Sequence, residues 1–383
     1  MSFVVSTLAI GCVLFIYTLW RIIWPLPMRW WWKLLLCIPL VLGAFRYPLL
    51  YKIYGGHFFR PDCPMAVELL CTWLFIALLM VLVFLLALEL VFLLPGLIWR
   101  RSAVFRKIRF SLFGMTVPVA LLASGWGMYR AFALPEVREI TIALPRLQQP
   151  VHLAMLTDLH ADRYKQAEFF REIVNRTNAL EADAIVITGD FEDGHLYSLA
   201  PSLAPLRNLK SRWGTFAVHG NHDYFSGHQA WQRYLRSLGI RFLNNEHVLP
   251  GPGHLIIAGI TDPAAAHDNC PTPNLEQALS GAPQDKPVVL LAHQPRIARE
   301  AAHRGVALQL SGHTHGGMAP GLRQLVALFN DDLVQGLYRL GDTQVYVSNA
   351  TGIWSGLPLR LFTPAEITLI HLVPRQFRPE RTL

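Results

Sequence analysis

The sequence predicts two regions of different fold class, an all-helical membrane domain of four spans followed by an α/β domain. Long apolar segments are confined to about the first 130 residues of a 383-residue chain whose mean hydropathy is +0.32. After residue 150, short runs rich in Val and Ile alternate with helical patterns, as in an α/β sandwich. An ordinary soluble protein of this length is less apolar, so membrane spans are expected.

The membrane domain is expected to cover residues 1–130. A span needs roughly 20 apolar residues to cross the hydrocarbon core, and four segments satisfy this: 3–24, 31–50, 67–98 and 110–128. A cleaved signal peptide would account for the first of them alone. The expected membrane interfaces carry tryptophan, which is enriched at that depth, at Trp30, Trp31, Trp32 and Trp99.

Basic residues near the span ends indicate an orientation. The side that carries Arg21, Arg29, Lys33 and the basic residues of 100–109 has eight, against six on the side of the C-terminal domain. Because the more basic side tends to stay inside the cell, the C-terminal domain is expected outside the cytoplasm. The cluster at 100–109 is also compatible with binding of anionic lipid. Glu89, within the third span, is either a functional intramembrane acid or a residue at the interface.

The net charge of +8 belongs to the membrane part. Residues 1–150 hold 14 Lys/Arg and 5 Asp/Glu, whereas residues 151–383 hold 20 and 21. A nearly neutral domain is not typical of nucleic-acid binding, so no nucleic-acid partner is expected. Cys270 is the single cysteine of residues 151–383, which excludes a disulfide within that domain and a cysteine-based zinc finger. The sequence identifies no protein partner.

The C-terminal half is expected to comprise a linker and first strand region at 131–150, an α/β domain at 151–373 and a tail at 374–383. The buried strands are expected at 152–157, 184–188, 215–218, 255–260, 288–292, 306–310, 344–347 and 366–371. Helices are predicted at 165–180 and from an N-cap at Ser226 to Leu238. Side chains that follow parallel strands meet at one edge of such a sheet, where ligands bind.

Five of these loops carry side chains that can bind metal. They are Asp158 and His160 in Thr-Asp-Leu-His, Asp190 in Thr-Gly-Asp, Asn221 in Gly-Asn-His-Asp, His293 after Val-Val-Leu-Leu-Ala, and His313 and His315 in Ser-Gly-His-Thr-His-Gly-Gly. Alternate side chains of an extended segment point the same way, so an Asp-x-His or His-x-His pair can aim both groups at one site. Oxygen and imidazole ligands without thiolate suit Mn, Fe or Zn. The sequence therefore predicts a metal centre.

The order of these motifs resembles the calcineurin-like metallophosphoesterases, and the resemblance extends over about 230 residues. It implies a four-layer αββα sandwich and two divalent metal ions. One ion is expected on Asp158, His160, Asp190 and His315, and the other on Asp190, Asn221, His293 and His313. Asp190 is expected to bridge the two ions.

The resemblance also implies hydrolysis of a phosphodiester or pyrophosphate bond by a hydroxide that the two ions activate. His222 is expected to act as the general acid, with Asp223 orienting its ring; the alternative is that His222 only binds the phosphate. His195, just behind Gly-Asp-Phe-Glu-Asp-Gly, and Arg360 are candidate substrate contacts.

Within the superfamily, the chain resembles a bacterial membrane-tethered branch with Gly-Asn-His-Asp-Tyr and Ala-His-Gln-Pro. Members of that branch act on phospholipid-like substrates or on the pyrophosphate of UDP-2,3-diacylglucosamine. The resemblance implies a bacterial inner membrane protein of lipid metabolism, with membrane lipids as neighbours and a lipid-linked or membrane-proximal substrate. Met318 stands where the branch usually has Gln, and Asn349 and Ala350 stand where it has a glycine-rich turn. Substrate contacts near Met318 are therefore not carried over.

Two other functions remain open from the sequence. The first is a hydrolase of soluble phosphomonoesters, nucleotides or phosphoprotein. The second is a non-catalytic, metal-dependent membrane sensor or scaffold, which the presence of His222 beside the full ligand set disfavours.

Overall fold

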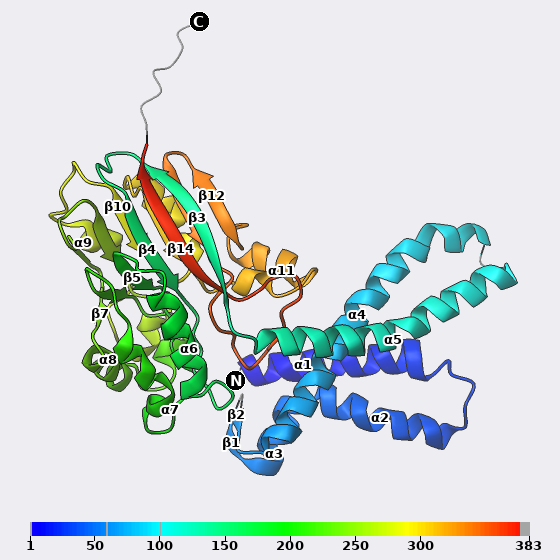
Figure 1. Ribbon diagram of the computed structural model, residues 1–383. Helices are drawn as coiled ribbons and strands as arrows, with labels where there is room; N and C mark the ends of the chain where they lie inside the picture. Colours follow the sequence, from blue (N-terminus) through cyan, green and yellow to red (C-terminus); the bar gives the residue numbers. More distant parts are fainter. Residues whose placement is uncertain (1, 59, 100, 376–383) are drawn as a thin grey trace, which may run out of the picture. The chain divides into compact units, whose positions relative to one another are not determined.

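The computed structural model describes residues 2–58, 60–99 and 101–375, which form two compact units (Figure 1). One unit is Met1–Arg130 together with Gly356–Leu361, and the other is Ala131–Ser355 together with Phe362–Leu383. Within the range 151–373 that was predicted for the α/β domain, the segment Gly356–Leu361 groups with the helices of the first unit. Most of the predicted tail at 374–383 lies outside the described residues.

The first unit is helical. Its helices are α1 (Ser2–Thr18), continued by the π-helical turn η1 (Leu19–Ile23), α2 (Trp30–Ala44), α3 (Arg46–Tyr54), α4 (Met65–Trp99) and α5 (Ala103–Ala131). Two short antiparallel strands, β1 (Gly56–His57) and β2 (Arg60–Pro61), join α3 to α4. Among the residues that the structure describes, three helical segments are long and apolar enough to cross a membrane: Val4–Ile23, Met65–Trp99 and Ala103–Ala131.

The second predicted span is not one straight helix. The chain bends by 83° between α2 and α3, so this pair forms at most one broken span. Pro48 has no backbone N–H with which to continue the helical ladder to Ala44. Arg46, the buried first residue of α3, donates from its guanidinium to Thr72 Oγ1 and, over 2.7 Å, to the carbonyl of Gly356. The apolar pattern predicted one straight span here, because it could not reveal that Arg46 is buried at a bend between two helices.

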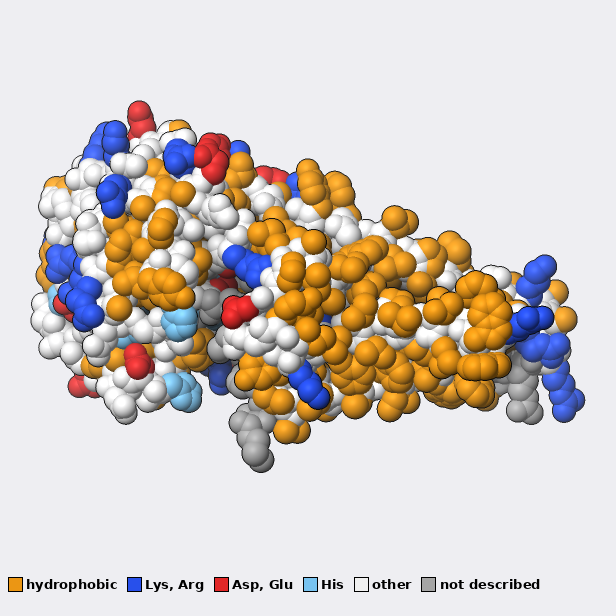
Figure 2. Space-filling model, turned by 90° about the horizontal axis from the view of Figure 1, so that it is seen from below, with side chains coloured by type: hydrophobic (Ala, Val, Ile, Leu, Met, Phe, Trp, Pro, Cys, Tyr) orange, Lys and Arg blue, Asp and Glu red, His pale blue; other side chains and the backbone are white. Residues whose placement is uncertain are grey.

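Apolar side chains cover most of the face of the helical unit that Figure 2 shows. In α4, the last buried residue is Leu85, and the leucines beyond it, such as Leu94 at 69% exposed, face outward. Apolar surface of this extent requires apolar surroundings, which confirms membrane association. Glu89 forms an ion pair with Arg21, and basic side chains gather at the end that carries the α4–α5 connection.

The second unit contains two six-stranded sheets. The first sheet has the order β3 (Glu136–Leu144), β14 (Glu366–Pro374), β4 (Val151–Leu156), β5 (Ala184–Ile187), β6 (Thr215–Ala217), β7 (Ile240–Phe242). The second has the order β12 (Gly336–Leu340), β13 (Thr343–Val347), β11 (Leu308–Ser311), β10 (Val288–Leu291), β9 (Ile256–Gly259), β8 (Glu246–Val248). Strands β4 to β7 run parallel, as do β9, β10, β11 and β13.

Helices cover the outer faces of both sheets: α6 (Ala167–Asn178), α7 (Leu196–Leu203), α8 (His228–Ser237), α9 (Leu275–Leu279) and α10 (Ala298–His303). A further helix of this unit, α11 (Leu322–Phe329), has no buried residue. Short 3-10 turns complete the unit: η2 (Ala204–Asn208), η3 (His222–Tyr224), η4 (Pro263–Asp268), η5 (Pro295–Ile297) and η6 (His315–Gly317). The N-cap of α8 is Gly227, with a φ of 87° and no side-chain cap, so the predicted Ser226 cap is wrong.

The cores show four layers. One cluster lies between the sheets and combines Val186 of β5 with Val289 of β10. A second packs the first sheet against α6, α7 and α8, with Trp231 fully enclosed. Smaller clusters pack the second sheet against α9 and α10. The arrangement of helix, sheet, sheet and helix confirms the predicted αββα sandwich. The strands β7, β8 and β12 were not predicted individually, because their short runs carry weak patterns.

Candidate metal centre

Strand register brings the predicted ligands to one edge of both sheets. Leu156 of β4 pairs with Ile187 of β5, and the loops that carry Asp158 and Asp190 follow directly. In the second sheet, Leu291 of β10 pairs with Leu310 of β11, and the loops with His293 and His313 follow. Because parallel strands end level with one another, residues far apart in the chain meet here.

The backbone at these loop residues is strained. A positive φ is uncommon outside glycine and costs free energy in each residue that adopts it. Five of the predicted ligands have one: Asp158 (52°), His160 (45°), Asp190 (55°), His313 (70°) and His315 (48°). Such conformations persist where the surrounding structure imposes them, and they cluster at functional sites.

One group of ligand atoms lies around Asp158. The ligand atoms of Asp158, His160 and His315 are all within 4.8 Å of one another. His315 Nε2 is 3.7 Å from Asp158 Oδ1, and His160 Nε2 is 3.6 Å from Asp190 Oδ2. Two carboxylates and two imidazoles therefore face a common point.

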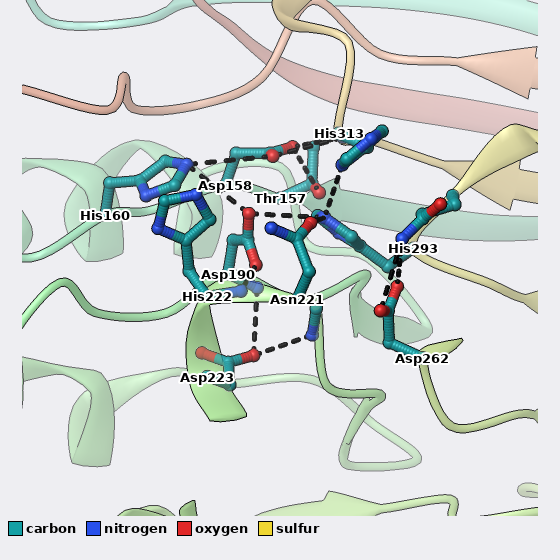
Figure 3. A network of polar contacts seen from close by, with 12 residues as sticks. Thr157, Asp158, His160, Asp190, Asn221, His222, Asp223, Asp262, His293 and His313 are labelled. Carbon is teal, nitrogen blue, oxygen red and sulfur yellow. Dashed lines mark hydrogen bonds and ion pairs between the residues drawn. The ribbon is translucent and has the colours of Figure 1, made fainter. Parts of the chain in front are cut away.

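A second group overlaps the first at Asp158, and Asp190 Oδ2 lies near a histidine of each group, His160 and His293 (Figure 3). The ligand atoms of Asp158, Asp190 and His293 are also within 4.8 Å of one another, and His293 Nε2 is 3.2 Å from Asp190 Oδ2. Asn221 Oδ1 lies 3.1 Å from His293 Nε2, and His313 Nδ1 lies 3.3 Å from that atom. All seven predicted ligands thus come together, with Asp190 between the two groups.

The histidine rings are held in the way that metal ligands require. His293 Nδ1 is 2.8 Å from the carbonyl of Thr188, and His160 Nδ1 is 3.1 Å from Asp193 Oδ2. Each contact fixes the tautomer that leaves Nε2 as a ligand atom. Within the described part of the chain, His160 Nε2 is buried and has no hydrogen-bond partner. A divalent cation would satisfy that atom, so the residues fit a metal centre.

Two glycines allow the close approach of the carboxylates. A Cβ on Gly220 would collide with the carboxylate of Asp190, and a Cβ on Gly312 would collide with Asp158 and Thr157. These are rigid, buried neighbours, so side chains at either position would displace the metal-binding carboxylates.

Asp193, rather than Asp223, contacts the ring of His222. Asp193 Oδ1 is 2.7 Å from His222 Nδ1, while its other oxygen holds His160. Asp223 instead accepts backbone N–H groups of Asp190, Phe191 and Gly220 over 2.7 to 3.0 Å. The prediction that Asp223 orients His222 is therefore wrong, because neighbouring side chains diverge in the tight turn η3. Asp193 lies three residues after Asp190 in the sequence, but no sequence pattern indicated that its carboxylate contacts His222.

The charges of this cluster shift its pKa values strongly. Burial opposes the protonated form of His222, but Asp190 and Asp193 raise its pKa to about 9. Burial and the neighbouring His293 lower the pKa of His313 to about 3, which keeps this ring neutral and able to bind metal. Cations in the centre would compensate the same carboxylates, so these values belong to the metal-free protein.

Two residues were predicted as substrate contacts, and two more near the centre were not predicted. His195 is exposed and precedes α7. Arg360 is 1% exposed and belongs to the segment Gly356–Leu361 of the helical unit. Trp354, which sequence reasoning missed, has its ring centroid 5.6 Å from that of His222. Asp262, also missed, is buried and accepts a hydrogen bond of 3.0 Å from Gln294, next to His293.

Comparisons with known proteins agree with this geometry. The family model for the calcineurin-like phosphoesterases matches residues 151–317. A protein named uncharacterized metallophosphoesterase from Helicobacter pylori strain J99 is 37% identical over 260 residues, which are 67% of this chain and 69% of that protein. The chain thus belongs to the calcineurin-like metallophosphoesterases, a family of metal-dependent phosphoester hydrolases.

Two further relatives bear on the architecture. The zebrafish (Danio rerio) protein named transmembrane protein with metallophosphoesterase domain is 34% identical over 261 residues, 64% of this chain and 59% of that protein. A metallophosphoesterase of Aquifex aeolicus is 31% identical over 264 residues, 66% of this chain and 97% of that protein. The matching region therefore makes up nearly all of one relative and little more than half of another.

Proposed function

We propose that the chain is a membrane-anchored hydrolase that uses two divalent cations to cleave a phosphodiester or pyrophosphate bond in a lipid-linked substrate. The observation that carries this proposal is the convergence of two buried carboxylates with four histidines and an asparagine, beside a further histidine held by Asp193. Structural metal sites have no use for an additional, oriented proton donor of this kind.

The proposed ligands divide into two sets around Asp190. Asp158, His160 and His315 would hold one cation with it, and Asn221, His293 and His313 the other. Manganese, iron and zinc all suit this mixture of oxygen and nitrogen. When bound, such a pair of cations lowers the pKa of a water molecule and compensates the charge of the phosphoryl oxygens.

His222 is proposed to protonate the leaving oxygen. Its Nδ1 contacts Asp193, so the proton that it offers to substrate is the one on Nε2. The carboxylate of Asp193, which is not among the proposed ligands, favours the protonated ring, which suits an acid that must hold its proton until the ester bond breaks. Trp354, beside this ring, would limit access of bulk water to it.

The membrane setting supports a lipid-linked substrate. The helices that anchor the chain keep the second unit, hereafter the catalytic unit, close to the bilayer. A lipid-linked substrate therefore has a high effective concentration at the metal centre. The orientation that we propose is a bacterial inner membrane with the α4–α5 connection, which carries Arg101, and the first turns of α5, which carry Arg106 and Lys107, in the cytoplasm. Helix α5 then crosses to the periplasmic side, where the catalytic unit follows.

Substrate profiling of the purified full-length protein tests the proposal. The panel contains a UDP-linked diacyl glycolipid and phospholipids in mixed micelles, bis(p-nitrophenyl) phosphate, nucleotides and a phosphopeptide, each with Mn²⁺ and then with chelator. We expect the highest kcat/KM for a lipid-linked substrate, loss with chelator, and loss in His222→Ala. Preference for the soluble phosphomonoesters would favour the alternative hydrolase, and metal binding without turnover of any substrate would favour a sensor or scaffold.

A further inference from the structure

Helix α11 presents apolar side chains to the surroundings of the catalytic unit. It has the sequence Leu-Arg-Gln-Leu-Val-Ala-Leu-Phe, and none of its eight residues is buried. Leu328 is 78% exposed and Phe329 is 68% exposed. Soluble surfaces rarely carry adjacent large apolar groups at this exposure unless something covers them.

The helix is capped by local hydrogen bonds at both ends. At its start, the N–H of Gly321 donates to Gln324 Oε1 over 2.9 Å. At its end, the buried Asn330 donates from Nδ2 to the carbonyl of Val326, also over 2.9 Å. These contacts stabilise the helical conformation at both ends, and Leu325, Leu328 and Phe329 are exposed along it.

The helix is also tied to the metal centre. It starts seven residues after His315, and a Cβ on Gly317 of η6 would collide with the backbone of Arg323. Met318, between them, accepts a hydrogen bond of 3.1 Å from Thr363 Oγ1. Thr363 follows Phe362, so this bond keeps Phe362 near the start of α11. Phe362 is 90% exposed and has a φ of 66°.

Phe362 continues a segment that is held at the end of a candidate span. The N–H of Arg360, two residues earlier, donates over 3.0 Å to the carbonyl of Gly127 in the last turns of α5. On the same turns, Trp126 and Tyr129 are exposed. Exposed aromatic residues at a span end mark the headgroup layer of a bilayer.

We propose that Leu325, Leu328, Phe329 and Phe362, hereafter the α11 surface, insert into the headgroup layer of the membrane that the chain spans. The metal centre then receives a phosphoester whose lipid stays embedded in the bilayer. The choice of substrate rests on the proposed function, whereas the membrane contact does not. Leucine and phenylalanine with a flanking arginine, here Arg323, are typical of helices that lie in this layer.

The test of contact uses the full chain in vesicles of phosphatidylethanolamine and phosphatidylglycerol. Leu328→Cys carries a nitroxide, in a background in which Cys12, Cys37 and Cys270 are alanine. Leu249→Cys, at another exposed leucine of the same unit, is the matched control. We expect the label at 328 to collide with lipid-soluble oxygen and to be shielded from a water-soluble nickel chelate, and the control label to show the reverse. A label at 328 that the nickel chelate reaches freely, or one shielded from both agents by a second copy, overturns the proposal.

The test of function compares two substrates on the same vesicles. The double variant Leu328→Glu and Phe329→Glu is expected to lower kcat/KM for a bilayer-borne phosphodiester by about tenfold and to leave bis(p-nitrophenyl) phosphate unchanged, as Leu249→Glu leaves both. An equal loss on both substrates contradicts the role of the α11 surface. If the wild-type protein hydrolyses neither substrate, the proposed function fails, and the labelling result still decides whether the surface contacts lipid.

Discussion

The two units of this protein use apolar and polar residues in opposite ways. In the helical unit, leucines such as Leu94 face outward, and a buried arginine, Arg46, donates hydrogen bonds to Thr72 and Gly356. In the catalytic unit, leucines such as Leu290 are enclosed, and the buried charges gather at one edge of the sheets. In both units the buried charged side chains lie where particular groups must be kept in position. In the helical unit this is the bend between α2 and α3, and in the other unit it is the metal centre.

The largest effect is expected at the carboxylate that both ligand groups share. Asp190→Asn removes charge from both proposed ions, so kcat/KM for a soluble phosphodiester should fall about a thousandfold or more. Asp342→Asn changes an exposed carboxylate of the same unit and should leave turnover unchanged. Near-normal turnover in Asp190→Asn would remove Asp190 from the centre.

The opposite roles of leucine in the two units can be measured as stability. Leu290→Ala opens a cavity in the fully enclosed core of the second sheet and should cost about 3 kcal/mol of unfolding free energy. Leu94→Ala, on the outward face of α4, should cost less than about 0.5 kcal/mol. Denaturant unfolding in detergent micelles gives both values. Equal costs would show that α4 packs against protein at this point.

The contact between Asp193 and His222 should appear in kcat and in its pH profile. Asp193→Asn is expected to lower kcat about 10- to 100-fold, because the rings of His222 and His160 both lose the carboxylate that orients them. Since Asp193 raises the pKa of His222, its removal should also move the alkaline limb of the profile, where the acid loses its proton, to lower pH.

A matched variant separates this role from a structural one. Asp223→Asn disturbs three backbone N–H contacts and should lower the thermal midpoint without a comparable displacement of the pH profile. If Asp223→Asn moves the alkaline limb and Asp193→Asn does not, the assignment of the two aspartates is reversed.

The smallest of these effects is expected at the bend of the helical unit. Arg46→Met removes the hydrogen bonds from the guanidinium to Thr72 and Gly356 and should destabilise the unit by about 1.5 kcal/mol. Lys52→Met, on the exposed face of α3, serves as the control and should change stability little. Thermal unfolding in micelles measures both, and a neutral Arg46→Met would mean that the bend is fixed by Pro48 alone.

The sequence predicted those features that follow from local pattern. Apolar length revealed the spans, and polar residues after Val/Ile-rich runs revealed the ligands, because strand direction alone brings such loops together. The bend at Arg46 and the partner of His222 escaped prediction, because both depend on contacts between distant segments. In the sequence, Asp223 directly follows His222, whereas Asp193 lies 29 residues before it. The structure shows that Asp193 contacts the ring and that Asp223 accepts backbone N–H groups instead. The return of Gly356–Leu361 to the helices left no local signal.

The proposed function requires a pair of cations in the carboxylate cluster around Asp158 and Asp190. Elemental analysis of the full-length protein, purified without chelator and then titrated with Mn²⁺, counts those ions while phosphodiesterase activity is followed. Activity is expected to saturate at two ions per chain, and Asp190→Asn is expected to retain fewer. Full activity after exhaustive chelation, or saturation at a single ion, would contradict this expectation.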